Sequence, residues 1–218
     1  MMHTIKPPTA TTMAARTAVI LFVFVVIFTG LLSGAYLWTL PTIAAAASEG
    51  KMKLIDEVLP RSSYDNDLLA DAISIEPSPV LGLDEAKPAY RARKNGKATA
   101  LVIEAVAPDG YAGKIRLLIA LNPDGALIGV RVTQHKETPG LGDYIEPKKG
   151  KDKEHPWITQ FDGLTPTALD AREWKVKKDG GRFDSVAGAT VTPRAVIKAV
   201  RKAAVYVVEN HETLFASK

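Results

Sequence analysis

The 218-residue chain contains no cysteine. This absence excludes disulfide bonds, iron–sulfur clusters held by thiolates, attached c-type haem and a catalytic thiol. A protein of this composition that carries electrons therefore needs an organic cofactor or another kind of metal site. The four histidines show neither metal-ligand spacing nor a Ser/His/Asp arrangement, and His135 is best interpreted as a surface residue. We expect no metal site and no catalytic residue.

The chain also lacks the pattern of a nucleic-acid-binding protein, although its formal charge is +4 and its pI is near 9.2. Its most lysine-rich stretch, "EPKKGKDKEH" at residues 146–155, is interrupted by acids and has no interleaved aromatic residues. This composition is typical of a solvated loop, so we expect no nucleic acid among the partners.

Charge is missing from residues 17–48, and residues 17–38 are almost continuously apolar. A bilayer core needs about 20 helical residues, and Tyr36 and Trp38 stand where aromatic rings favour the interface. We therefore predict a membrane helix. The alternative is a cleaved signal peptide, because "IAAAAS" offers small residues, but the apolar run exceeds the roughly 7–15 residues usual for one.

Basic residues flank this apolar run on both sides, with Lys6 and Arg16 before it and Lys51, Lys53 and Arg61 after it. Counting these charges does not decide the orientation, since long domains can cross a membrane regardless of charge.

The remainder of the chain predicts an α+β fold. Residues 51–73 read as a helix, a break at Pro60 and a second short helix, followed by a proline-containing connector. From residue 89, apolar runs alternate with the turn signals "NG" and "NPDG", which predicts an antiparallel meander packed on helices. Residues 173–181 predict a further strand and turn. The chain closes with a helix over 193–210, for which Thr192 is the predicted N-cap and Pro193 the first helical residue.

Two stretches have residues suited to ligand binding. In "AGATVTP", Gly188 permits a tight turn, and Thr190 places a hydroxyl ahead of the free N–H groups of a helix, which attract anions such as phosphate. In "HKETPGLGD", two glycines and a proline can lay backbone along a flat ligand, with Leu141 as an apolar contact and Glu137 or Thr138 as hydrogen-bonding groups. Each stretch alone is more often an ordinary turn, cap or loop than a ligand site.

Taken together and in this order, "HKETPGLGD" and "DSVAGATVTPRAV" resemble the FMN-binding domain of the G subunit of the Rnf electron transport complex. That family is similar to the C subunit of the sodium-translocating NADH:quinone reductase. The resemblance extends over the apolar helix, "EVLP", "YDNDLL", "GYAGKIRLLIALNPDG" and the closing helix. It implies an inner-membrane protein with a cytoplasmic segment at 1–16, a transmembrane helix at 17–40, juxtamembrane helices and a linker at 41–87, and an FMN-binding domain at 88–218 on the periplasmic side.

By this resemblance, Thr190 carries FMN through a phosphoester bond. The family motif is Ser/Thr-Gly-Ala-Thr, and this chain has Ala187 at its first position. The remaining cofactor-binding residues that the resemblance implies are those around the threonine and those near the flavin ring: Ser185, Gly188, Ala189 and Thr192, and Glu137, Thr138, Gly140 and Leu141.

The implied function is that of a flavoprotein subunit, incomplete as an enzyme by itself, which relays electrons within a translocase coupling NADH and ferredoxin to ion transport. Its partners would be the other membrane subunits, the flavin-attaching transferase and the lipid bilayer. Two alternatives remain open at this point. The chain could be a membrane-anchored flavin sensor or regulator, or an anchored scaffold protein without a cofactor.

Overall fold

The computed structural model describes residues 9–150, 152–166 and 170–216. The chain divides into two units, Met1–Gly50 and Lys51–Lys218. Helix α1 (Ala10–Asp56) supplies the first unit, and its last turns belong to the second. Among the described residues, α1 is the helix long and apolar enough to cross a membrane, and none of its most apolar stretch is buried against protein.

The second unit is built on a five-stranded antiparallel sheet with strand order β1-β2-β3-β4-β5, which confirms the predicted antiparallel meander. The strands are β1 (Ala72–Ile75), β2 (Lys87–Lys94), β3 (Lys97–Gly110), β4 (Gly113–Leu121) and β5 (Leu127–Gln134). The predicted turns are confirmed: Asn95 and Gly96 have φ of 51° and 75°, and Gly125 of the "NPDG" turn has φ of 79°. Such angles suit Asn and Gly because other side chains clash there.

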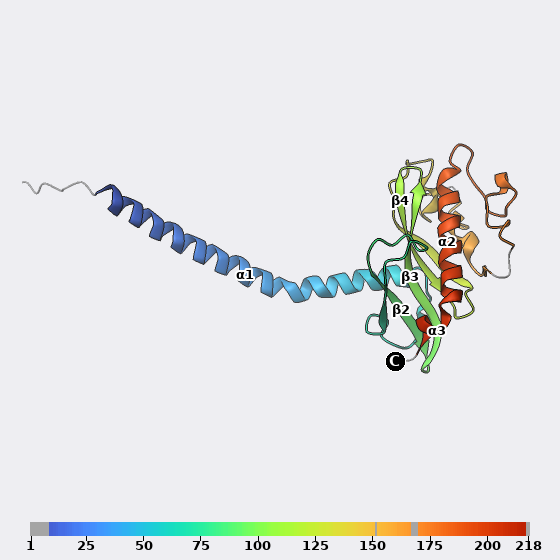
Figure 1. Ribbon diagram of the computed structural model, residues 1–218, viewed down its shortest axis with the longest axis horizontal. Coiled ribbons are helices and arrows are strands. Elements are labelled where there is room, and N and C mark those ends of the chain that lie inside the picture. Colours follow the sequence, from blue (N-terminus) through green and yellow to red (C-terminus); the bar gives the residue numbers. More distant parts are fainter. Residues whose placement is uncertain (1–8, 151, 167–169, 217–218) are drawn as a thin grey trace, which may run out of the picture. The chain divides into compact units, whose positions relative to one another are not determined.

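Both faces of this sheet are covered. On one face, Ile115, Leu117, Ile119 and Leu121 are fully buried in a core shared with α2 (Val191–Glu209). Figure 1 shows α2 running along β3. On the other face, Leu118 and Ala120 belong to a smaller core closed by Ile55, Val58 and Leu59 from the end of α1 and the residues after it. The predicted packing of the meander on helices is thus confirmed.

The segments that complete the core are short. Three 3₁₀ turns, η2 (Asp143–Ile145), η3 (Trp157–Phe161) and η4 (Lys177–Asp179), follow β5. The η3 turn buries the apolar "WITQF" residues, where Phe161 packs against Trp157, Trp174 and Phe183. Helix α3 (His211–Phe215) ends the described chain and buries Leu214 and Phe215.

Two predicted elements differ from the structure. The second short helix within residues 51–73 is replaced by a 3₁₀ turn, η1 (Arg61–Ser63), a turn capped by the Asp67 carboxylate, and the edge strand β1. The strand predicted at 173–181 is a single bridge between Val176 and Phe183. It cannot extend because the chain folds back tightly, so that a Cβ on Gly181 would lie 2.1 Å from the carbonyl oxygen of Lys175.

Candidate functional site

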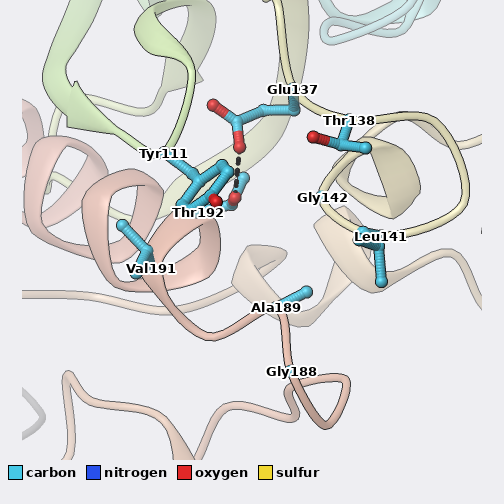
Figure 2. A pocket seen from close by; sticks show the side chains of 9 residues that line it. All are labelled: Tyr111, Glu137, Thr138, Leu141, Gly142, Gly188, Ala189, Val191 and Thr192. Atoms are coloured by element: carbon cyan, nitrogen blue, oxygen red, sulfur yellow. Dashed lines mark hydrogen bonds between the residues drawn. The ribbon is translucent and has the colours of Figure 1, made fainter.

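A cleft of about 290 Å³ lies where three segments of the second unit meet (Figure 2). The segments are the β3–β4 hairpin, the loop after β5 and the start of α2. The residues that line the cleft are Tyr111, Glu137, Thr138, Leu141, Gly142, Gly188, Ala189, Val191 and Thr192. The two stretches singled out in the sequence therefore contribute to one cleft, with the hairpin as a third wall.

The Glu137 carboxylate joins these three walls. It is only 4% exposed, and one of its oxygens accepts the Ala112 N–H of the hairpin at 3.0 Å. Its other oxygen accepts a hydrogen bond from the Thr192 hydroxyl in the first turn of α2, drawn in Figure 2. Gly142 makes room for this contact, because a Cβ there would lie 2.8 Å from both the Glu137 and the Thr192 side-chain oxygens.

The prediction that Thr192 caps the closing helix is wrong. Helix α2 begins at Val191, Thr190 occupies the N-cap position, and Thr192 is 1% exposed with its hydroxyl committed to Glu137. A hydrogen bond to a charged carboxylate is stronger than one between neutral groups, and this decides where the hydroxyl points.

Thr190 lies in the sequence between the lining residues Ala189 and Val191, and it is not itself among the residues that line the cleft. Its side chain makes no capping hydrogen bond to α2, and no hydrogen bond of its hydroxyl is found within the described part of the chain. No acidic residue lies in the first turn of α2. The helix N–H groups and the positive end of the helix dipole there are thus available to an anion.

Gly188, two residues before Thr190, faces open space. Its φ is +83°, a conformation that favours glycine, and a Cβ built on it would meet nothing within 4 Å. The turn is closed by the Ala189 N–H, which donates to the Val186 carbonyl at 3.0 Å.

Tyr144 holds this turn in place, and it is a residue that sequence reasoning missed. Its hydroxyl donates to the Ala189 carbonyl at 3.2 Å and accepts the Val186 N–H at 3.4 Å. Burial raises the pKa of the Tyr144 hydroxyl, while the Val186 hydrogen bond works against that rise. A phenol with a raised pKa stays protonated at neutral pH, so it continues to donate to the turn.

Three apolar side chains at the cleft are exposed: Tyr111 is 71%, Leu141 49% and Val191 43% exposed. Of these, only Leu141 was predicted. Gly142, Tyr111 and Val191 are lining residues that sequence reasoning also missed. Tyr111 could have been recognised from the sequence, because it is an aromatic residue in the glycine-bounded turn "DGYAG". An aromatic side chain in such a turn is not expected to be buried in the core.

Besides Thr190, two predicted residues are absent from the lining of this cleft. Gly140 and Ser185 line a neighbouring hollow of about 380 Å³ together with Asp143 and Tyr144, and Leu141 borders both hollows. Gly140 has φ of +76°, and its N–H donates to the Asp143 carboxylate at 2.8 Å. Its role in the structure is to turn the loop that presents Thr138 and Leu141.

His135 was predicted to be a surface residue, but its side chain is only 11% exposed and lies 2.6 Å from the Glu146 carboxylate. It is separate from any metal-ligand set, since no group of three or more His, Asp or Glu side chains suited to a metal ion occurs among the described residues.

Comparisons with known proteins assign the part of the chain that contains this cleft to a family. Residues 110–205, which contain every residue that lines the cleft, match the family model of the FMN-binding domain. The G subunit of the ion-translocating oxidoreductase complex of Pseudomonas aeruginosa is 46% identical over 201 residues, 92% of each chain. The chain belongs to this family of G subunits of ion-translocating oxidoreductase complexes. The family member from Pseudoalteromonas atlantica is 40% identical, over 93% of this chain and 92% of the relative.

Among solved structures, the crystal structure of Shewanella oneidensis NqrC matches this member of the G subunit family with a TM-score of 0.44 and 25% identity. The match covers 69% of this chain and 73% of that one.

The cleft residues fit the FMN-binding assignment. A phosphate needs donors and a close approach of the backbone, which the start of α2 and the open space at Gly188 provide. An aromatic ring system needs apolar walls, which Leu141, Val191 and Tyr111 provide.

Proposed function

We propose that the chain carries FMN on Thr190 through a phosphoester bond and relays electrons as a membrane-anchored subunit of an Rnf-type complex. The observation that carries the proposal is the Thr190 side chain. It is placed at the N-terminus of α2, has no capping bond, and lies in the sequence between Ala189 and Val191, which line a cleft inside the residues that match the FMN-binding domain.

The chain's own groups hold and orient the cofactor. Gly188 lets the phosphate approach, and the first-turn N–H groups of α2 stabilise its charge. Leu141 and Val191 offer apolar walls to the ring, while Glu137 keeps the loop and the helix at a fixed separation. FMN supplies the redox chemistry, since it can accept and donate electrons singly or in pairs, and the protein's task is to hold it and expose its edge.

The names of the relatives support assignment to a multisubunit ion-translocating oxidoreductase. We infer that the other membrane subunits are its partners, that a flavin-attaching transferase modifies it, and that the complex couples NADH and ferredoxin to ion movement. With α1 as a single-pass inner-membrane anchor, we place the second unit on the periplasmic side. Covalent attachment has a physical rationale there, because a dissociated flavin would be lost to a large external volume.

The decisive experiment replaces Thr190 with valine in the full-length chain, produced together with the host's flavin-attaching enzyme. Valine matches the shape and β-branching of threonine but cannot form a phosphoester. We expect wild type to give a flavin-fluorescent band on a denaturing gel and a flavin mass on the Thr190 peptide. Thr190→Val should lose both, together with electron transfer, and still assemble in the membrane.

Two controls sharpen this result. Thr190→Ser restores a hydroxyl, so partial attachment is expected if the hydroxyl alone is required. Thr192→Val removes the neighbouring hydroxyl, which is committed to Glu137, and should keep covalent flavin. Covalent flavin on Thr190→Val, or none on wild type despite the enzyme, would contradict the assignment.

A further inference from the structure

Another hollow, of about 400 Å³, lies on the sheet face opposite to α2 and contains no residue of the flavin cleft. It is bounded by the last turns of α1 and by strands β2 to β5, all within the second unit. Its floor is apolar and includes Ile55, Tyr90 and Leu118, which belong to the smaller core.

The charged residues at this hollow are mostly basic. Lys51, Lys87 and Arg116 line it, and Glu104 is the acidic residue among its lining side chains. Lys87 is paired with Glu85 at 2.7 Å. Within the part of the chain that the structure describes, neither Lys51 nor Arg116 has a hydrogen-bonded or ion-pair partner on its side chain.

Arg116 is the basic residue best suited to an anion. The nearby carboxylates of Asp84 and Glu85 are exposed and form hydrogen bonds with Lys114 and Lys87 respectively. Arg116 attracts these carboxylates only through its charge, without a hydrogen bond. A half-buried guanidinium without a hydrogen-bonded partner can bind a phosphate through two N–H groups.

One residue of this hollow, Lys51, lies on α1 shortly after the apolar stretch. Lys51 follows the last residue of the charge-free stretch, Ser48, by three positions on α1, which is about 5 Å of helix. The charge-free residues 17–48 make about 48 Å of helix, slightly more than the roughly 40–45 Å thickness of a bilayer with both of its polar layers. A basic side chain at this position is therefore within reach of lipid phosphates if α1 spans the membrane.

We propose that this hollow, defined by Lys51, Lys87 and Arg116, binds the phosphate of an anionic phospholipid headgroup. The inference rests on the proposed membrane anchor and is independent of FMN attachment. The basic rim contacts the phosphate, and the apolar floor contacts the glycerol end of the acyl chains. Bound lipid would join the end of α1 to strands β2 and β4, and so hold the redox unit at the membrane surface.

The test uses full-length protein in neutral detergent micelles that contain either phosphatidylglycerol or phosphatidylcholine, with bound lipids measured by native mass spectrometry. Each basic side chain near an anionic surface contributes about fivefold in affinity. We expect wild type to prefer phosphatidylglycerol, and Lys87→Gln/Arg116→Gln to lose about 25-fold in affinity for it. The preference of wild type should also fall as salt is raised from about 50 to about 500 mM, because screening weakens the attraction.

The matched control is Arg172→Gln/Lys202→Gln, which makes the same charge change at exposed positions away from the hollow. It should bind phosphatidylglycerol like wild type. Equal lipid affinity of the two double variants, or no preference in wild type, would overturn the inference. Because Lys87→Gln breaks an ion pair, Lys51→Gln serves as a second variant on the exposed surface of α1, with about a fivefold loss expected.

Further measurements separate the possible failures. Glycerol 3-phosphate should not displace the lipid at equal concentration; displacement would identify a soluble phosphate ligand and overturn the lipid assignment. Unchanged lipid affinity with impaired assembly of the complex in Lys87→Gln/Arg116→Gln would point to an acidic protein partner and would also overturn the lipid assignment.

Covalent flavin should be the same in all variants, so a lost lipid preference with normal flavin leaves the proposed function standing. Release of wild type from membranes by carbonate would overturn both the anchor and this inference.

Discussion

At the scale of single residues, one carboxylate is the common acceptor for two walls of the cleft. Glu137 accepts the Ala112 N–H and the Thr192 hydroxyl while almost fully buried. Removing a buried acceptor leaves its donors unsatisfied, which costs more than the hydrogen bond itself contributes. The residue predicted to contact flavin therefore also fixes the shape of the cleft.

We expect Glu137→Ala to lower the free energy of unfolding by about 1–3 kcal/mol, because Ala112 N–H and the Thr192 hydroxyl lose their acceptor. Glu137→Gln keeps a carbonyl oxygen and the side-chain volume, and the Thr192 hydroxyl can rotate to accept from the amide. Its loss should be clearly smaller than that of Glu137→Ala. Denaturant unfolding of the full-length protein, followed by tryptophan fluorescence, measures both. Equal losses in the two variants would show that the hydrogen bonds do not hold the cleft together.

The sequence predicts local contacts of this site and misses the distant ones. Gly188 and Thr190 are recognisable because a turn and a helix start are encoded by adjacent residues. The Thr192–Glu137 bond joins residues 55 apart, and the Tyr144–Ala189 bond joins residues 45 apart. Local propensity favours Thr192 as a cap, and only the folded chain brings to it the acceptor that overrides this preference.

At the scale of elements, the sequence again predicts structure that depends on neighbouring residues and misses structure that depends on distant contacts. The hairpins around Asn95 and Gly125 are predictable because their turns require particular residues at particular positions. Strand β1 has four residues and lies at the sheet edge, and its pairing with β2 comes from tertiary contacts. The pattern at residues 51–73 therefore predicts a second short helix, where the folded chain forms a 3₁₀ turn, a turn capped by Asp67 and the start of β1.

Asp71, which precedes β1, is linked through two arginines to Ala216, the residue after α3. Its carboxylate accepts from Arg91 at 2.9 Å and Arg93 at 2.7 Å, and the two arginines also donate to the Ala216 carbonyl at 2.7 and 3.1 Å. Burial acts to raise the pKa of Asp71, but the hydrogen bonds and charges of Arg93 and Arg91 outweigh it and hold this pKa below its usual range. The network links β1, β2 and the residue after α3.

We expect Asp71→Asn to lower the free energy of unfolding by about 1–3 kcal/mol at pH 7, since both arginines lose their anionic partner. A lowered folded-state pKa contributes stability above the unfolded-state pKa, near 3.9, and loses it as pH falls through the folded-state value. The difference in Tm between wild type and Asp71→Asn should therefore be constant from about pH 7 to 5 and shrink below about pH 4. A difference that stayed constant down to about pH 2 would exclude this ionic contribution.

At the scale of the whole molecule, one helix, α1, contributes residues to both units of the chain. The boundary falls at Gly50, so the last turns of the helix belong to the core of the second unit. Ile55 is 1% exposed and closes the smaller core against Leu59 and Leu68. A single continuous helix thus serves both as the proposed anchor and as cover for the second face of the sheet.

This arrangement predicts different behaviour for two shortened chains. Full-length protein should remain in the membrane fraction after carbonate washing, because α1 is long and apolar enough to span the bilayer. A chain that begins at Glu49 lacks the apolar stretch but keeps Ile55, so it should be soluble and folded. A chain that begins at Glu57 should be less stable by about 2–5 kcal/mol, the cost of losing a buried Ile side chain from a core.

Ile55→Ala in the Glu49 chain should show a similar loss by denaturant unfolding, which assigns the effect to this side chain. Equal stability of the two shortened chains would contradict the shared role of α1, and native protein cleaved near Ala47 and free in the periplasm would contradict the anchor.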